Sequence, residues 1–157
     1  RPWRTDAEAW LTTLAEAGAV DDTMATRLRA DLQRRDPGRA AAGLGHFDLC
    51  GENMLRDHAD RLRVFDNERI GPGPFGFDLA RTWYRWDLPT ADWQRFERRY
   101  AAATRRPAPF ADAPFWRLVV LLQSAHLRRR TTPAHRSIPL ERLRRLVAAS
   151  PAQDSAP

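Results

Sequence analysis

The stretch that decides the fold reads His46-Phe47-Asp48-Leu49-Cys50-Gly51-Glu52-Asn53 and, a few residues later, Val64-Phe65-Asp66. Gly51, with Gly43 and Gly45 just before the stretch, argues against a long helix here. Short apolar runs at 53–56 and 61–65 flank a polar turn, a pattern that predicts a β-hairpin. Because a hairpin pairs its strands, residues 53 and 66 should lie side by side. The sequence thus predicts a loop and hairpin that bring two carboxylates and one amide oxygen together.

Helices are expected on both sides of this segment. Apolar residues at helical spacing predict them over these ranges: 6–17, about 21–35, 79–86, 90–104, about 111–130, and onward from 139. Residues 69–77 are rich in glycine and proline and are expected to form a loop. The predicted fold is mainly α-helical with one small β-hairpin. It forms one domain over 1–149, with parts at 1–42, 43–77 and 78–149, and a frayed tail at 150–157.

The composition is that of a globular protein. Apolar residues make up 43% of the 157 residues and charged residues 29%, enough for a real core. No run of about 18 apolar residues is present, so no membrane span is expected. Cys50 is the only cysteine, which excludes an internal disulfide and favours a reducing, cytoplasmic location.

The charge is positive and unevenly spread. The net charge is +6, and all 26 basic residues are arginine. Thirteen of them lie between residues 94 and 147, against three acidic residues. A polycationic partner is therefore not expected for this segment, whereas a phosphate, a carboxylate-rich partner or nucleic acid would suit it. A solvated helical face is the alternative explanation.

The spacing His-x-Asp-x-x-x-x-Asn, with a later aspartate, suits phosphoryl transfer. That reaction needs a carboxylate to orient the acceptor hydroxyl, which Asp48 would supply. It also needs hard oxygen ligands for Mg²⁺, which neutralises charge between the phosphates. Asn53 and Asp66 would supply an amide and a carboxylate oxygen. These residues could instead cap turns, which is their commonest role in loops.

Four segments together resemble the aminoglycoside phosphotransferase and choline kinase family: 45–49, 53–55, 64–68 and 77–80. The resemblance implies a protein-kinase-like C-terminal lobe that uses ATP and Mg²⁺. It makes Asp48 the catalytic base, and Asn53 and Asp66 the metal ligands. His46 would brace the catalytic loop and Glu68 would lie near the metal. Asp78 would be a buried carboxylate that ties the loop down, with a helix N-cap as its alternative role.

The chain departs from the family pattern in two ways. Phe47 stands where the family usually has glycine, and Cys50-Gly51-Glu52 replaces a common His-Pro-Gly. A second glycine motif, Gly71-x-Gly73-x-x-Gly76, is not expected to bind phosphate. Its prolines remove backbone N–H donors, and no strand-and-helix unit is expected around it.

The N-terminal lobe that binds the nucleotide in such an enzyme is not expected in this chain. About 45 residues precede the catalytic loop and suggest two helices, and there is no lysine for the α/β-phosphates. We therefore expect a C-terminal lobe that needs an N-terminal lobe, in cis or in trans, and is inactive alone. The acceptor would be a small hydroxyl compound or a peptide hydroxyl, and not a polycation. A non-catalytic kinase-like scaffold is the second hypothesis, and a basic nucleic-acid-binding module is the third.

Overall fold

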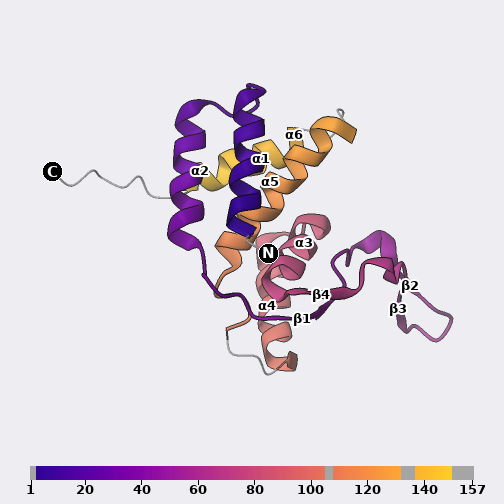
Figure 1. Ribbon diagram of the computed structural model, residues 1–157. Coiled ribbons are helices and arrows are strands. Elements are labelled where there is room, and N and C mark those ends of the chain that lie inside the picture. The colour runs from indigo at the N-terminus through magenta and orange to yellow at the C-terminus, as the bar shows by residue number, and fades with distance from the viewer. Residues whose placement is uncertain (1–2, 105–107, 132–136, 150–157) are drawn as a thin grey trace. The chain divides into compact units, whose positions relative to one another are not determined.

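The computed structural model describes residues 3–104, 108–131 and 137–149, and it is mainly helical (Figure 1). The predicted tail at 150–157 lies outside the described residues. The helices are α1 (Trp3–Glu16), α2 (Asp22–Arg35), α3 (Phe75–Trp86), α4 (Thr90–Thr104), α5 (Ala113–Thr131) and α6 (Ser137–Ala149). The strands are β1 (Ala42–Gly45), β2 (Met54–Arg56), β3 (Leu62–Val64) and β4 (Gly71–Pro74), with short 3₁₀ turns η1 (Gly51–Asn53) and η2 (Asn67–Arg69). No helix in these described ranges has the length and apolarity needed to cross a membrane.

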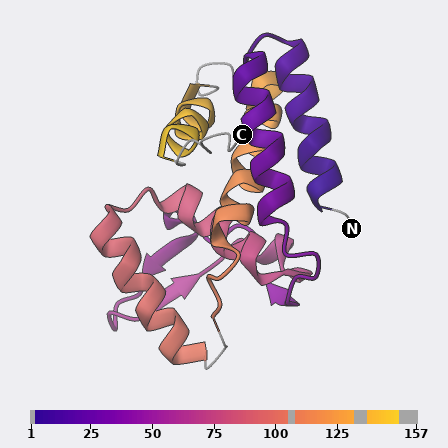
Figure 2. The same ribbon diagram turned by 90° about the vertical axis from the view of Figure 1, so that its left-hand side faces the viewer.

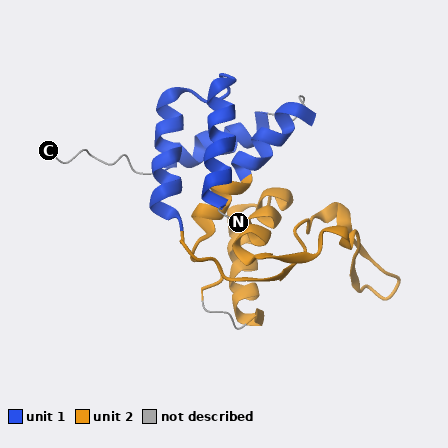
Figure 3. Ribbon diagram, in the orientation of Figure 1, with its two compact units in different colours: residues 1–36, 121–157 blue, residues 37–120 orange. Residues whose placement is uncertain are grey.

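The chain divides into two compact units (Figure 3). One combines residues 1–36 with 121–157, and the other is residues 37–120. The first unit thus joins the leading helices to the end of the chain, a grouping that the predicted division at 42 and 78 did not indicate. Every predicted site residue belongs to the second unit.

The first unit is a helical cluster in which α1 and α2 lie side by side (Figure 2). Leu11 and Leu14 of α1 are buried, as are the four-spaced Leu28 and Leu32 of α2. The Asp21 side chain caps α2 by accepting a hydrogen bond from Met24 N at 2.8 Å. Both leading helices were predicted from this pattern and are confirmed.

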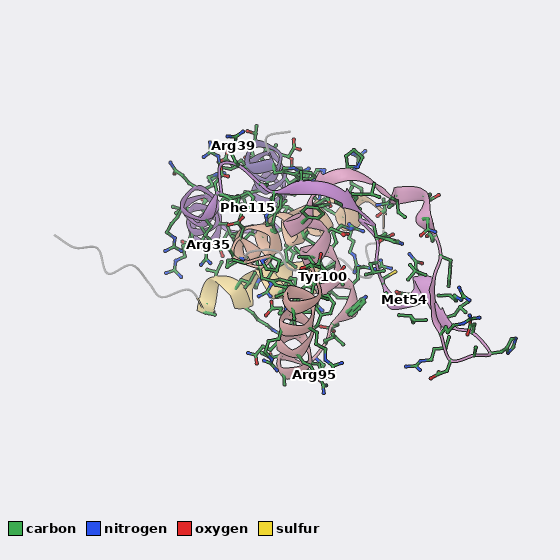
Figure 4. The ribbon with its side chains drawn as sticks, turned by 90° about the horizontal axis from the view of Figure 1, so that it is seen from below. Arg35, Arg39, Met54, Arg95, Tyr100 and Phe115 are labelled. Atoms are coloured by element: carbon green, nitrogen blue, oxygen red, sulfur yellow. The ribbon has the colours of Figure 1, made fainter. Side chains whose placement is uncertain are left out.

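In the second unit, the predicted hairpin is confirmed as β2 and β3. The two strands pair antiparallel, with Met54 opposite Val64. Asp57 organises the turn: its carboxylate accepts hydrogen bonds from the backbone N–H groups of Ala59 and Arg61, at 2.9 and 3.0 Å. Figure 4 labels Met54 at the start of β2, where the hairpin leaves the rest of its unit.

The prediction of a loop over residues 69–77 was wrong. Residues 71–74 form β4, which pairs antiparallel with β1, with Gly43 opposite Gly73. The missing side chains leave room for aromatic rings: a Cβ on Gly43 would lie 2.1 Å from Phe75 Cζ, and one on Gly73 would lie 2.5 Å from Phe47 Cζ. The prolines of β4 are tolerated because a two-stranded sheet leaves each strand one unpaired edge.

Helix α3 begins at Phe75, four residues before its predicted start. It packs on β1 and β4. The ring of Phe77, in its first turn, lies 6.3 Å from that of Trp116 and edge-on to it. The helices predicted at 90–104 and 111–130 are confirmed as α4 and α5, and Trp93 and Trp116 are buried, as expected for core tryptophans.

The contact between Phe47 and Gly73 gives a double-mutant prediction. Gly73→Ala is expected to lower the free energy of unfolding by about 1–3 kcal/mol, because the new methyl group would collide with the Phe47 ring. In a Phe47→Gly background the same change should cost much less, since the ring is gone. Urea denaturation of the four proteins measures the coupling energy. Equal costs in both backgrounds would contradict the contact.

Candidate active site

The candidate active site is built on one face of α3. Asp78, Arg81 and Arg85 follow one another at i, i+3 and i+7, so their side chains project from successive turns on the same side. Each of the three binds a different part of the loop at residues 46–52. Side chains from successive turns of α3 therefore fix the position of this loop.

Asp78 holds the start of the loop. Its carboxylate accepts hydrogen bonds from Phe47 N at 2.6 Å and from His46 N at 3.3 Å. Asp78 lies inside the first turn of α3, whose N-cap position is Pro74, so the alternative of a helix N-cap is wrong. A charged acceptor for two backbone N–H groups gives this loop a fixed position.

Arg81 and Arg85 hold the rest of the loop. Arg81 Nη2 donates to Asp48 Oδ1 at 2.9 Å. Arg85 Nη2 donates to Cys50 Sγ at 3.3 Å and lies 3.5 Å from Glu52 Oε2. Sequence reasoning missed both arginines. Their spacing from Asp78 places all three on one helix face, and this was the signal available.

The loop itself carries backbone strain at Phe47. This residue has φ of 60°, in the left-handed region that favours the glycine usual in the family. Packing offsets the strain, because the Phe47 ring lies against Gly73 and 6.2 Å from the Phe77 ring. Next to it, His46 Nδ1 accepts a hydrogen bond from Asp48 N at 3.3 Å. His46 therefore contacts the backbone of the loop, in the position expected of a brace.

Asn53 joins the loop to the hairpin. Its side-chain Nδ2 donates to the Asp48 carbonyl oxygen at 3.0 Å, and its own carbonyl accepts from Phe65 N at 3.0 Å. Asn53 is buried, at 9% exposed. The second contact pairs Asn53 with Phe65 across the hairpin, so the predicted pairing of residues 53 and 66 is off by one residue. Asn53 thus links the backbone at Asp48 to the hairpin that ends at Asp66.

Asp66 is exposed and adopts a left-handed conformation, with φ of 59° and ψ of 59°. Aspartate tolerates this region better than most residues, and such outliers gather at functional sites. No hydrogen bond or ion pair ties the Asp66 carboxylate to any residue within the described ranges. Glu68, in η2, is also exposed.

Asn53 and Asp66 carry oxygen donors of the kind that a magnesium ion prefers. Asn53 uses Nδ2 as a donor, and neither its side-chain oxygen nor the Asp66 carboxylate is engaged in a hydrogen bond within the described residues. Across residues 3–104, 108–131 and 137–149, no three His, Cys, Asp or Glu side chains gather into a complete metal centre. An open site with one or two protein ligands is how Mg²⁺ is usually held beside phosphates.

Arginines hold Asp48 in its ionised form. Partial burial raises the pKa of Asp48, but the hydrogen bond from Arg81 and the charges of Arg81, Arg85 and Arg69 outweigh it. The net result is a pKa below the ordinary value for aspartate. Asp48 is therefore a carboxylate at neutral pH, able to accept a hydrogen bond from a hydroxyl group.

Arg81→Met is expected to raise the pKa of Asp48, because the mutation removes the guanidinium group that lowers this pKa while burial continues to raise it. In the wild type the folded pKa lies below the unfolded value of about 3.9. Asp48 thus contributes stability above that pH, which is lost as the pH falls through the folded pKa. Arg81→Met should lack the stability that the ionised Asp48 carboxylate contributes in the wild type. A ¹³C NMR titration of the Asp48 carboxyl carbon measures the shift, with Arg95→Met as the control; equal midpoints in all three proteins would contradict the prediction.

The chain is similar to a known protein family. The model of the phosphotransferase enzyme family matches residues 1–119, which is most of the chain and includes every residue of the candidate active site. No curated protein and no solved structure matches the chain significantly. The extent of the family match is decisive: the chain belongs to the phosphotransferase enzyme family.

Proposed function

We propose that this protein is an ATP-dependent phosphotransferase that moves the γ-phosphoryl group to a hydroxyl group. Membership of the family gives the reaction at a coarse level. The observation that carries the finer proposal is the position of Asp48. It is held as a carboxylate by Arg81 and is linked through Asn53 to the hairpin that ends at Asp66.

Each residue has a proposed role. Asp48 orients the acceptor hydroxyl and accepts its proton as the new O–P bond forms and the bond between the γ-phosphorus and the leaving ADP breaks. Asn53 and Asp66 would hold Mg²⁺, which when bound neutralises charge on the transferred phosphoryl group. His46 and Asp78 fix the loop by their backbone contacts. Glu68, exposed on the 3₁₀ turn after Asp66, is an acidic neighbour of the metal.

A kinase-like architecture is part of the proposal. We regard the described residues as a C-terminal lobe, with the nucleotide-covering lobe supplied by another part of the same protein or by a separate chain. The surface of the segment from β1 to the start of β4, which includes the hairpin, supports this. Most of the exposed large apolar side chains of the described residues lie between positions 44 and 70: Leu44, Leu55, Leu62, Val64, Phe65 and Ile70. A two-stranded hairpin is marginal alone, so a covering partner would also stabilise it. We propose a cytoplasmic location, which the single cysteine of the sequence favours.

The experiment is phosphoryl transfer from labelled ATP by this chain combined with its second lobe. Transfer should require Mg²⁺ and fall at least about 10²-fold in Asp66→Asn, because an amide is a weaker ligand than a carboxylate. Asp60→Asn is the matched control, since Asp60 lies in the hairpin turn, is paired with Arg56 and has a side chain that is 79% exposed. Transfer that is insensitive to Asp66 would contradict the proposed metal site. Absence of transfer in the assembled protein would favour a non-catalytic scaffold.

A further inference from the structure

We propose that the acceptor carries an anionic group, a phosphate or a carboxylate, which Arg85 binds while the acceptor hydroxyl lies on Asp48. This inference rests on the proposed function, because it names the substrate class of the same site. It narrows the acceptor from any hydroxyl compound to a hydroxyl compound with a negative charge.

Arg85 has strong hydrogen-bond donors and only weak partners. A guanidinium group carries five N–H donors. Within the described ranges, Arg85 contacts the Cys50 thiol at 3.3 Å and the Glu52 carboxylate at 3.5 Å. A thiol is a weak acceptor. The Glu52 side chain is 73% exposed, so water competes for this ion pair.

Other arginines of the same unit show the contrast. Arg61 and Arg63 both donate to Asp57 Oδ2, at 3.0 and 2.8 Å. Arg117 donates to Glu97 Oε1 at 3.0 Å and lies over the Trp83 ring, 5.0 Å from its centroid. Those guanidinium groups already have good partners. Arg85 does not, and its side chain remains 30% exposed beside the reacting carboxylate.

The charge around Asp48 also favours an anionic ligand. Arg81, Arg85 and Arg69 all act on Asp48 electrostatically. Arg69 is exposed in η2, directly after Asp66, and forms no ion pair with the residues that the structure describes. Arg81 is already paired with Asp48, so Arg85 and Arg69 are the groups that would repel a cationic acceptor. An anionic acceptor would be attracted, since opposite charges in a partly buried site interact more strongly than in water.

The spacing of Arg81 and Arg85 on α3 limits the length of the ligand. Arg81 holds Asp48 from one turn of α3, and Arg85 extends from the next turn on the same face. Residues four apart on a helix have Cβ atoms roughly 5–6 Å apart. A ligand that bridges Asp48 and Arg85 should therefore have its hydroxyl and anionic groups separated by a few bonds. Guanidinium binds phosphate and carboxylate through two parallel hydrogen bonds, which would fix the ligand's orientation.

The test uses three matched probes: glycerol 3-phosphate, glycerol and 3-amino-1,2-propanediol. Their binding to this chain is measured by calorimetry at low ionic strength, without nucleotide. The phosphate should bind at least about 10-fold more tightly than glycerol, and the amine less tightly than glycerol. Equal binding of all three probes would overturn the inference.

Variants locate the anion. Arg85→Gln should weaken glycerol 3-phosphate binding about 10-fold or more, whereas Glu52→Gln should strengthen it, because a competing carboxylate is removed. Arg95→Gln is the control, since Arg95 is 61% exposed on α4 and paired with Asp92. Equal loss in Arg85→Gln and Arg95→Gln would show a general charge effect and overturn the inference. Because Glu52 is exposed, Glu52→Gln tests the inference even if Arg85→Gln folds poorly. If Glu52→Gln did not bind glycerol 3-phosphate more tightly than the wild type, the inference would also be overturned.

Two further experiments distinguish the anion site from a nucleotide-phosphate site and from the proposed function itself. Mg·ADP added as a competitor should leave glycerol 3-phosphate bound; its displacement would assign the arginines to the nucleotide phosphates and overturn the inference. Asp48→Asn should bind glycerol 3-phosphate at least as tightly as the wild type while failing to transfer phosphate.

If the assembled enzyme phosphorylates glycerol and glycerol 3-phosphate with equal kcat/KM, the inference fails and the proposed function stands. If the anion binds as expected but nothing is transferred, the proposed function fails and the anion site stands.

Discussion

Asp48→Asn is expected to reduce phosphoryl transfer by the assembled enzyme about 10³-fold. The amide keeps the shape of the carboxylate but cannot accept a proton, and general acid–base groups typically contribute 10²–10⁴-fold. The measurement is a single-turnover assay with labelled ATP and saturating acceptor, so that the chemical step is followed and not product release.

The control for this variant must separate chemistry from folding. Asp48 pairs with Arg81, and both side chains are mostly buried, at 19% and 14% exposed. Asp48→Asn therefore leaves a guanidinium group without its charged partner and is expected to cost about 1–3 kcal/mol of stability. Circular dichroism at the assay temperature should show a folded protein. A folded variant that retains wild-type turnover would remove Asp48 from the mechanism.

Gly76→Ala is expected to lower the free energy of unfolding by about 3 kcal/mol. A Cβ at this position would lie 2.1 Å from Trp116 Cδ1 and 2.2 Å from Nε1. Trp116 is 2% exposed, so its ring has no room to withdraw. Helix propensity acts in the opposite direction, because alanine is favoured over glycine in a helix by about 1 kcal/mol. The sign of the measured change in the free energy of unfolding therefore shows whether the clash with Trp116 or the gain in helix propensity is larger.

Urea denaturation provides the measurement, and Gly51→Ala provides the matched control. Gly51 has no atom within 4 Å of an added Cβ and lies in the 3₁₀ turn η1 of the same unit. Its replacement should change stability by no more than about 0.5 kcal/mol. A Gly76→Ala protein as stable as the wild type would mean that α3 does not pack against Trp116 as closely as described.

Much of the fold could be predicted because the signals are local. The α2 helix has its cap, Asp21, and its four-spaced leucines within one short segment. The hairpin has its turn and both apolar strands within residues 53–65. Each of these elements satisfies its backbone hydrogen bonds among near neighbours, so the residue pattern is sufficient.

The pairing of β1 with β4 could not be predicted in this way. The two strands are some thirty residues apart, and glycine and proline in β4 have low strand propensity. Aromatic rings from Phe47 and Phe75 cover the glycines and so stabilise the pairing. The early start of α3 has a related cause, since its first turn packs on these same strands.

The sequence by itself determined which oxygen-bearing groups are available and how far apart they are along the chain: Asp48, Asn53 and Asp66, with a hairpin between the last two. Only the tertiary structure decided the electrostatic environment of Asp48. Arg81 lies 33 residues from Asp48 in sequence and Arg85 lies 35 residues from Cys50, and they reach the loop because α3 lies beside it in the fold. Charge interactions depend on distance in space and on burial, and neither quantity is fixed until the chain has folded.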